Sequence, residues 1–140
     1  MTENRAKRIP ANKTAKPLSM LVVDDDPSSR DLLGAILRRK FNVTVHVAHD
    51  GPEAMLKCRE LTLDIVWLDI DMPGKDGLET LEVILRNNAE QFVVMVSAHG
   101  TMDYVRKAIS NGARGFIVKP YTMSKVQDAV HHYLDGGHGA

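Results

Sequence analysis

Cysteine, long apolar runs and net charge are all scarce in this sequence, and each shortage excludes a class of protein. The one cysteine, Cys58, cannot form an intrachain disulfide, which fits a reducing compartment, and we expect a cytoplasmic protein. No apolar run approaches the roughly 20 residues of a transmembrane helix, and the N-terminus has no signal-peptide apolar segment, so we expect no membrane partner. Because 18 basic residues balance 18 acidic ones, there is no overall attraction to nucleic acid.

The zero net charge hides a basic N-terminal segment. Residues 1–17 contain five basic side chains and one acidic side chain, so they carry +4 and the remainder carries −4. Their polar composition and two prolines predict a disordered tail. A nucleic-acid-binding or partner-binding arm is the alternative, although no aromatic residue supports it. The glycine-rich residues 135–140 are expected to be a flexible tail, which leaves 18–134 as one domain.

Apolar strands alternate with amphipathic helices five times along this domain. Apolar or alternating runs bounded by turn residues predict strands at 18–23, 42–48, 63–69, 91–96 and 115–118. Capping residues followed by apolar residues at helical spacing predict helices at about 26–39, 50–61, 76–85, 101–112 and 122–134. This order is typical of an α/β fold in which helices cover both faces of a doubly wound parallel sheet, giving three layers.

The same periodicities predict which side chains face the core. The strand at 42–48 has one polar face, which is typical of a sheet edge, whereas Trp67 lies mid-strand and is expected to be buried. Cys58 falls on an inner helix stripe, so we interpret it as a core residue and not as a nucleophile. The helix side chains expected to face inward are Leu32, Leu33, Ile36, Leu37, Ala54, Met55, Cys58, Leu61, Leu78, Leu81, Ile84, Leu85, Val105, Ala108, Ile109, Met123, Val126, Val130 and Leu134.

Chemically capable side chains end four of the five predicted strands. Asp24 and Asp25 follow the first strand, Asp69 ends the third, Ser97 ends the fourth, and Lys119 follows the fifth. The carboxyl ends of parallel strands share one edge of the sheet, so we expect these side chains to surround one crevice. Clustered carboxylates suit Mg²⁺. A carboxylate can also accept a phosphoryl group, whose oxygens an ammonium can neutralise and a hydroxyl can hydrogen-bond. For Asp69 taken alone, a loop carboxylate in an Asx turn is the alternative.

Four motifs resemble those of the receiver domain of two-component response regulators. They are Leu-Val-Val-Asp-Asp-Asp at 21–26, Leu-Asp-Ile-Asp-Met-Pro-Gly at 68–74 with Asp-Gly at 76–77, Val-Ser-Ala at 96–98 and Phe-Ile-Val-Lys-Pro at 116–120. The resemblance covers about residues 18–134 and implies the flavodoxin-like (βα)5 fold with strand order 2-1-3-4-5. It implies a stand-alone receiver similar to the chemotaxis regulators. Such a protein is a switch and not an enzyme, beyond catalysing its own phosphorylation and dephosphorylation.

The resemblance implies a metal-assisted phosphoacceptor site. Asp69 would accept the phosphoryl group. A Mg²⁺ or Mn²⁺ ion would be bound directly by Asp25 and Asp69, by the backbone carbonyl of Asp71, and through water by Asp24. Two residues near this site could also tune the lifetime of the phosphoryl group, namely the Asp71 carboxylate and His99. For Asp71 the alternative is a loop-capping role, and for His99 it is a solvated loop side chain.

The resemblance also implies a switch that responds to the phosphoryl group. Ser97 would turn toward that group, and Lys119 would pair with it. Phe116 stands at the aromatic position that rotates inward as the serine moves. The Lys119–Pro120 peptide would be cis, which an X-Pro bond allows at a small energetic cost.

The response would be read on one surface and passed to protein partners. That surface is expected over the helix at 101–112, the strand at 115–118 and the helix at 122–134, and it would bind a target or form a homodimer. The phosphoryl donor would be a sensor histidine kinase or a histidine phosphotransfer protein. The chain has no DNA-binding domain after 134, so the output is expected to come from protein contact or onward phosphotransfer.

Two other readings compete with the receiver. Asp69-Ile70-Asp71 resembles the nucleophile motif of haloacid-dehalogenase-type phosphatases, but that motif belongs at the end of the first strand and is accompanied by a cap domain. A non-phosphorylated interaction module is the second, which the complete set of acidic residues and Lys119 argues against. Apart from these readings, a further metal site is disfavoured, because His46, His49, His131 and His132 lack zinc-site spacing.

Overall fold

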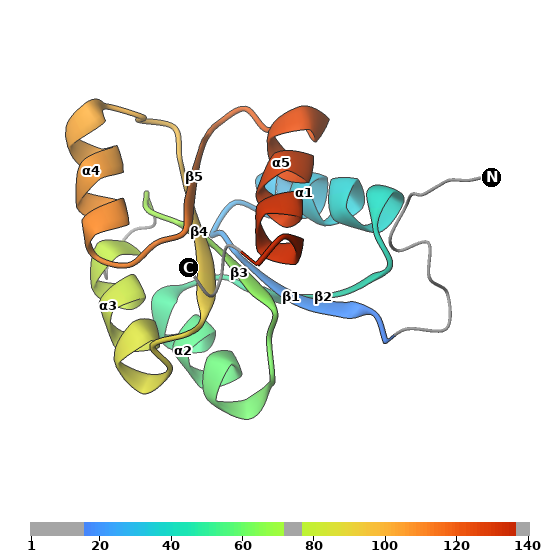
Figure 1. The fold of residues 1–140 in the computed structure, drawn as a ribbon, viewed down its shortest axis with the longest axis horizontal. Coiled ribbons are helices and arrows are strands. Elements are labelled where there is room, and N and C mark those ends of the chain that lie inside the picture. The colour runs from blue at the N-terminus through green and yellow to red at the C-terminus, as the bar shows by residue number, and fades with distance from the viewer. Residues whose placement is uncertain (1–15, 72–76, 137–140) are drawn as a thin grey trace.

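The computed structural model describes residues 16–71 and 77–136, in which helices cover both faces of a parallel sheet (Figure 1). The strands are β1 (Leu18–Val23), β2 (Val43–Ala48), β3 (Ile65–Asp69), β4 (Phe92–Ser97) and β5 (Gly115–Val118). The helices are α1 (Pro27–Lys40), α2 (Gly51–Glu60), α3 (Gly77–Asn87), α4 (Met102–Ser110) and α5 (Met123–Leu134). The strand order is β2-β1-β3-β4-β5 with every pair parallel, so the expected fold class and strand order are confirmed.

Some sequence predictions concern residues beyond the described ranges. The tails at 1–17 and 135–140 fall largely on 1–15 and 137–140, and the proposed domain limits therefore stay predictions. The capping residue Asp76 and the Pro73-Gly74 turn also lie outside the described residues. Among the residues that the structure describes, no helix is both long and apolar enough to cross a membrane.

Side-chain caps explain where the helices begin. Asp26, followed by proline, caps α1, and Asp50 caps α2, each by accepting a hydrogen bond from a main-chain N–H two or three residues on. Thr101 and Thr122 cap α4 and α5 in the same way. Beyond the last turn of α4, Gly112 has a φ of +107°, a left-handed conformation that glycine adopts without strain. These local signals fix where the loops give way to helices.

The sheet separates two apolar layers. Helices α1 and α5 cover one face, and α2, α3 and α4 cover the other (Figure 1). Alternation along β3 sends Ile65 and Trp67 toward α1 and α5, and Val66 and Leu68 toward α2, α3 and α4. Trp67 is fully buried, as expected, and its indole N–H has no hydrogen-bond partner among the described residues.

The buried apolar faces of the helices are narrower than the sequence pattern predicts. Leu32, Ile109 and Leu134 were expected to face inward, but they are 48%, 47% and 37% exposed, so these three predictions are wrong. Each lies at the margin of its stripe, and how a helix lies on the sheet decides whether a marginal side chain is covered. The edge position of β2 is confirmed. Cys58 is half-buried against the core, and burial raises the pKa of its thiol to about 11, as suits a packing residue.

Candidate functional site

The carboxyl edge of the sheet brings the predicted site residues together. Asp69 is the last residue of β3 and Ser97 the last of β4, while Asp24 follows β1 and Lys119 follows β5. Main-chain hydrogen bonds continue the sheet past these ends: the Lys119 N–H donates to the Ser97 carbonyl at 2.8 Å. Asp24, Asp69 and Ser97 are only 1%, 2% and 0% exposed, which is unusual for polar side chains and makes their partners important.

Three carboxylates and one ammonium form the centre of this edge. Oxygen atoms of Asp24, Asp25 and Asp69 lie within 4.8 Å of one another. The Lys119 Nζ is 3.1 Å from Asp24 Oδ2 and 3.4 Å from Asp69 Oδ2. One cation against three anions leaves an excess of negative charge on hard oxygen ligands. The residues therefore fit a divalent ion such as Mg²⁺, which binds through one or two carboxylates and retains waters.

The environment pushes the pKa values of the two buried carboxyls apart. Burial, with a smaller contribution from the neighbouring Asp24 charge, raises the pKa of Asp69 to about 6, although the Asp71 N–H and Lys119 oppose the rise. For Asp24, burial also acts to raise the pKa. Hydrogen bonds from the Asp26 N–H and the Ser29 side chain, together with Lys119, outweigh burial and leave that pKa lowered. Asp69 is thus the carboxylate whose negative charge is less well compensated by the protein.

Several residues that support Asp24 were not identified from the sequence. The Asp26 N–H donates to Asp24 Oδ1 at 2.9 Å, and Arg30 Nη1 donates to the Asp24 carbonyl at 3.0 Å. Ser29 hydrogen-bonds both the Asp24 carboxylate and Tyr121, whose pKa is raised to about 12, chiefly by burial. Ser29 and Arg30 lie in the first turn of α1. Only the proximity of that turn to the strand ends gives them a role, and the sequence carries no signal of it.

A second group of contacts joins the end of β3 to the end of β4. The Asp71 N–H donates to Asp69 Oδ1 at 2.9 Å. The Asp71 side chain points to the neighbouring strand end, where its Oδ2 accepts hydrogen bonds from the Ser97 hydroxyl at 3.1 Å and the Ala98 N–H at 2.9 Å. His99 Nδ1 lies 3.6 Å from Asp71 Oδ1. Asp71 and His99, which the sequence placed near the crevice separately, are therefore in contact with each other.

Two backbone features complete the edge. The Lys119–Pro120 peptide is cis, the isomer that the resemblance implies. A Cβ atom on Gly77 would lie 2.6 Å from the Ile70 Cα and 2.8 Å from the Asp69 carbonyl oxygen, so only glycine allows α3 to start this close to β3. Phe116 lies earlier on β5, where it is half-buried and packs against the apolar cluster under α2, α3 and α4.

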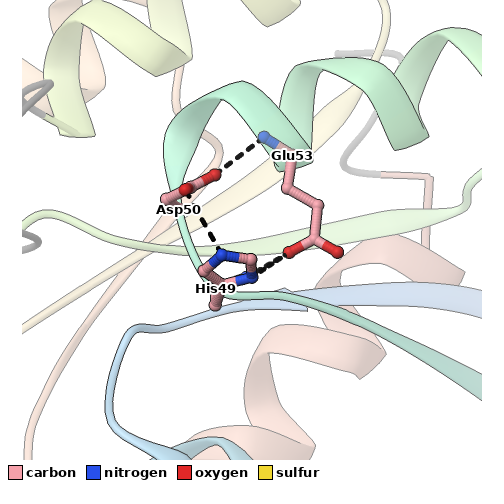
Figure 2. A group of neighbouring side chains, drawn as sticks. All are labelled: His49, Asp50 and Glu53. Carbon is pink, nitrogen blue, oxygen red and sulfur yellow. Dashed lines mark hydrogen bonds and ion pairs between the residues drawn. The ribbon is translucent and has the colours of Figure 1, made fainter.

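A second group of potential metal ligands lies at the start of α2 and has a structural explanation. Figure 2 shows His49, Asp50 and Glu53, whose ligand atoms lie within 4.8 Å of one another. Asp50 Oδ1 caps the Glu53 N–H at 2.8 Å, and Glu53 Oε1 accepts from the His49 N–H at 2.7 Å. The Lys57 ammonium is 3.7 Å from Glu53 Oε2, so it already compensates the charge that would attract a cation. We interpret this group as a helix cap.

Comparison with known proteins matches both the sequence and the fold. The model of the response regulator receiver domain matches residues 20–131. The chemotaxis protein CheY of Listeria monocytogenes is 40% identical over 113 residues, which cover 81% of this chain and 95% of that protein. CheY of Bacillus subtilis is 35% identical over 116 residues, which cover 83% and 97%.

A solved structure agrees with the sequence comparisons on both family and fold. The CheX-CheY-BeF3-Mg²⁺ complex of Borrelia burgdorferi aligns with a TM-score of 0.81 and 34% identity, covering 89% of this chain and 97% of that one. The haloacid-dehalogenase alternative is not favoured, because the match is to another family. Receivers of the CheY type take phosphate from histidine kinases, bind Mg²⁺ at an acidic site and act on targets as signalling switches, not as classical enzymes. The family match, the relatives and the 2-1-3-4-5 sheet agree, and this chain belongs to the response regulator receiver domain family.

Proposed function

We propose that Asp69 is the phosphoacceptor of this receiver. The observation that carries the proposal is a buried carboxylate at the end of the central strand β3, 3.4 Å from a lysine ammonium and beside two further carboxylates. A carboxylate oxygen of Asp69 attacks the phosphorus of a phosphohistidine, a phosphorus–oxygen bond forms, and the phosphorus–nitrogen bond breaks with its electron pair going to the imidazole. The donor is a sensor histidine kinase or a histidine phosphotransfer protein.

The other residues at this edge hold and neutralise the phosphoryl group. A Mg²⁺ or Mn²⁺ ion would be bound directly by the carboxylates of Asp25 and Asp69 and by the backbone carbonyl of Asp71, and through water by Asp24. The ion would supply positive charge to the phosphoryl oxygens. The Lys119 ammonium lies 3.4 Å from Asp69 Oδ2 and would also neutralise the phosphoryl group. The Ser97 hydroxyl contributes a hydrogen bond, and the same constellation supports self-catalysed transfer and hydrolysis.

The test is the intact mass of the folded protein after treatment with acetyl phosphate and Mg²⁺. We expect one phosphoryl adduct in the wild type, none in Asp69→Asn, and a strongly reduced yield in Asp25→Asn. Asp31→Asn removes an exposed carboxylate of α1 and is the matched control, with an unchanged yield. If the wild type forms no adduct and also fails to bind beryllofluoride with Mg²⁺, Asp69 is not a phosphoacceptor.

We propose that phosphorylation changes the surface formed by α4, β5 and α5, through Ser97 and Phe116. Helix α4 exposes Met102, Tyr104 and Ile109, which are 63%, 38% and 47% exposed. A groove of about 380 Å³ runs beside β5 and α5, lined in part by Phe116 and Lys125. Apolar side chains beside an edge strand suit a protein partner, either a target or a second copy of this chain.

Light scattering with and without beryllofluoride and Mg²⁺ separates these partners. A doubling of mass that Ile109→Glu abolishes supports the homodimer. An unchanged monomer mass excludes it and leaves a different protein as the partner.

We place the protein in the cytoplasm, which is supported by Cys58 as a free thiol.

A further inference from the structure

The Asp71 carboxylate occupies a pair of donors at the end of β4. Its Oδ2 accepts from the Ser97 hydroxyl at 3.1 Å and from the Ala98 N–H at 2.9 Å. Two donors from consecutive residues that converge on one anionic oxygen are the arrangement that proteins use to bind an oxyanion. Here the oxyanion is part of the chain itself.

The Ser97 hydroxyl has only one proton to give. Its oxygen already accepts the His99 N–H at 2.8 Å, which orients the hydroxyl. The acceptors within reach of that proton are Asp71 Oδ2 at 3.1 Å, Asp71 Oδ1 at 3.4 Å and the His99 carbonyl at 3.3 Å. A serine hydroxyl donates one hydrogen bond at a time. While Asp71 receives that bond, Ser97 cannot give it to another anion.

Asp71 connects these donors to the phosphoacceptor Asp69. The Asp71 N–H binds Asp69 Oδ1 at 2.9 Å, so the backbone of Asp71 stands against the Asp69 carboxylate while its side chain reaches the end of β4. A phosphoryl group on Asp69 would carry about two negative charges beside the Asp71 carboxylate. Two neighbouring anions repel each other, and both would accept the hydrogen bonds that Ser97 and Ala98 donate.

We propose that Asp71 is an internal competitor for the phosphoryl-binding donors. In the unphosphorylated protein its carboxylate holds Ser97 and the Ala98 N–H. It leaves them when a phosphoryl group, or its beryllofluoride analogue, binds at Asp69. This inference rests on the proposed role of Asp69. It makes Asp71 a positioning residue that keeps Ser97 in the inactive arrangement.

The test is equilibrium binding of beryllofluoride at saturating Mg²⁺, measured for wild type, Asp71→Ala and Asp31→Asn. Removing the competitor should tighten binding about tenfold or more, the size expected for displacing charge-assisted hydrogen bonds. Asp31→Asn is the matched control. It removes an exposed negative charge of α1 and leaves the Ser97 and Ala98 donors untouched, so we expect a change of less than about threefold.

A double-mutant cycle and an amide signal separate competition from simple charge removal. In a Ser97→Ala background the gain from Asp71→Ala should shrink by several fold, because one of the contested donors is gone. In beryllofluoride-free protein, Asp71→Ala should also shift the Ala98 amide proton resonance upfield. An equal gain in both backgrounds, or equal gains for Asp71→Ala and Asp31→Asn, would overturn the proposal that Asp71 is a competitor.

The failure of this proposal is distinguishable from a failure of the phosphoacceptor role. Whether the wild type binds beryllofluoride at all tests the phosphoacceptor role, and Asp69→Asn gives the signal expected without binding. If the wild type binds and Asp71→Ala binds no more tightly, the competitor proposal alone fails. If the wild type and every variant fail to bind, the phosphoacceptor role fails and the competitor falls with it.

Discussion

Replacing Asp69 with asparagine should stabilise the metal-free protein at pH 7.5. The pKa of this buried carboxyl rises from 3.8 to about 6 on folding, mainly because burial disfavours its charge. A carboxyl that binds its proton more tightly in the folded state favours folding below pH 4, and this contribution is lost as the pH rises through 6. Since a tenfold change in proton affinity corresponds to about 1.4 kcal/mol, ionised Asp69 opposes folding by up to about 3 kcal/mol.

Urea unfolding in EDTA, followed by tryptophan fluorescence, measures this effect directly. Trp67 is the only tryptophan and is fully buried, so its emission reports loss of the core. Asp69→Asn should exceed the wild type by about 1–3 kcal/mol at pH 7.5, and by much less at pH 4.5. Exposed Asp31→Asn should track the wild type at both values.

Magnesium should reduce the stability advantage of Asp69→Asn over the wild type. An ion that binds only the folded state stabilises it by about 2.7 kcal/mol at a concentration 100 times its dissociation constant. The wild type should gain this stability, and Asp69→Asn should gain less, because one ligand is lost. The reasoning is refuted if Asp69→Asn is no more stable than the wild type at pH 7.5 in EDTA, or if its advantage is independent of pH.

Four further substitutions test the packing of the fold, each with the urea midpoint as a readout. Leu33→Ala should cost about 2–5 kcal/mol because Leu33 is fully buried, whereas exposed Leu32→Ala should cost less than about 0.5 kcal/mol; equal costs would contradict the observed helix face. Gly77→Ala should lower both stability, by about 1–3 kcal/mol, and beryllofluoride affinity, because the new Cβ meets the backbone at the end of β3; unchanged affinity would show that α3 can retreat freely. Tyr133→Phe should cost about 1–2 kcal/mol by removing the hydroxyl that donates to Asp64 at 2.7 Å, and no loss would mean that this bond contributes nothing net.

Local patterns in the sequence were enough to predict the elements and the residues at the strand ends. Apolar runs and capping residues act over a few neighbours, so the ten elements were placed nearly where they occur. A parallel sheet then requires that Asp24, Asp69 and Lys119 meet at one edge, whatever the packing details. The strand order came from the resemblance and not from these patterns, because pairing depends on contacts between distant segments.

Only the tertiary structure decided the pKa values and the hydrogen-bond partners of the site residues. Asp24, Asp25 and Asp69 are the same residue type in the sequence. In the fold, hydrogen bonds and Lys119 outweigh burial and lower the pKa of Asp24, whereas burial raises the pKa of Asp69. The hold of Asp71 on Ser97 joins residues 26 positions apart, so no local pattern could reveal it. Burial at the margin of a helix stripe likewise depends on how the helix lies on the sheet, which is why Leu32 was misplaced. Residue types and spacings determine which groups meet, while desolvation and the direction of each hydrogen bond, which exist only in the folded chain, determine what those groups can do.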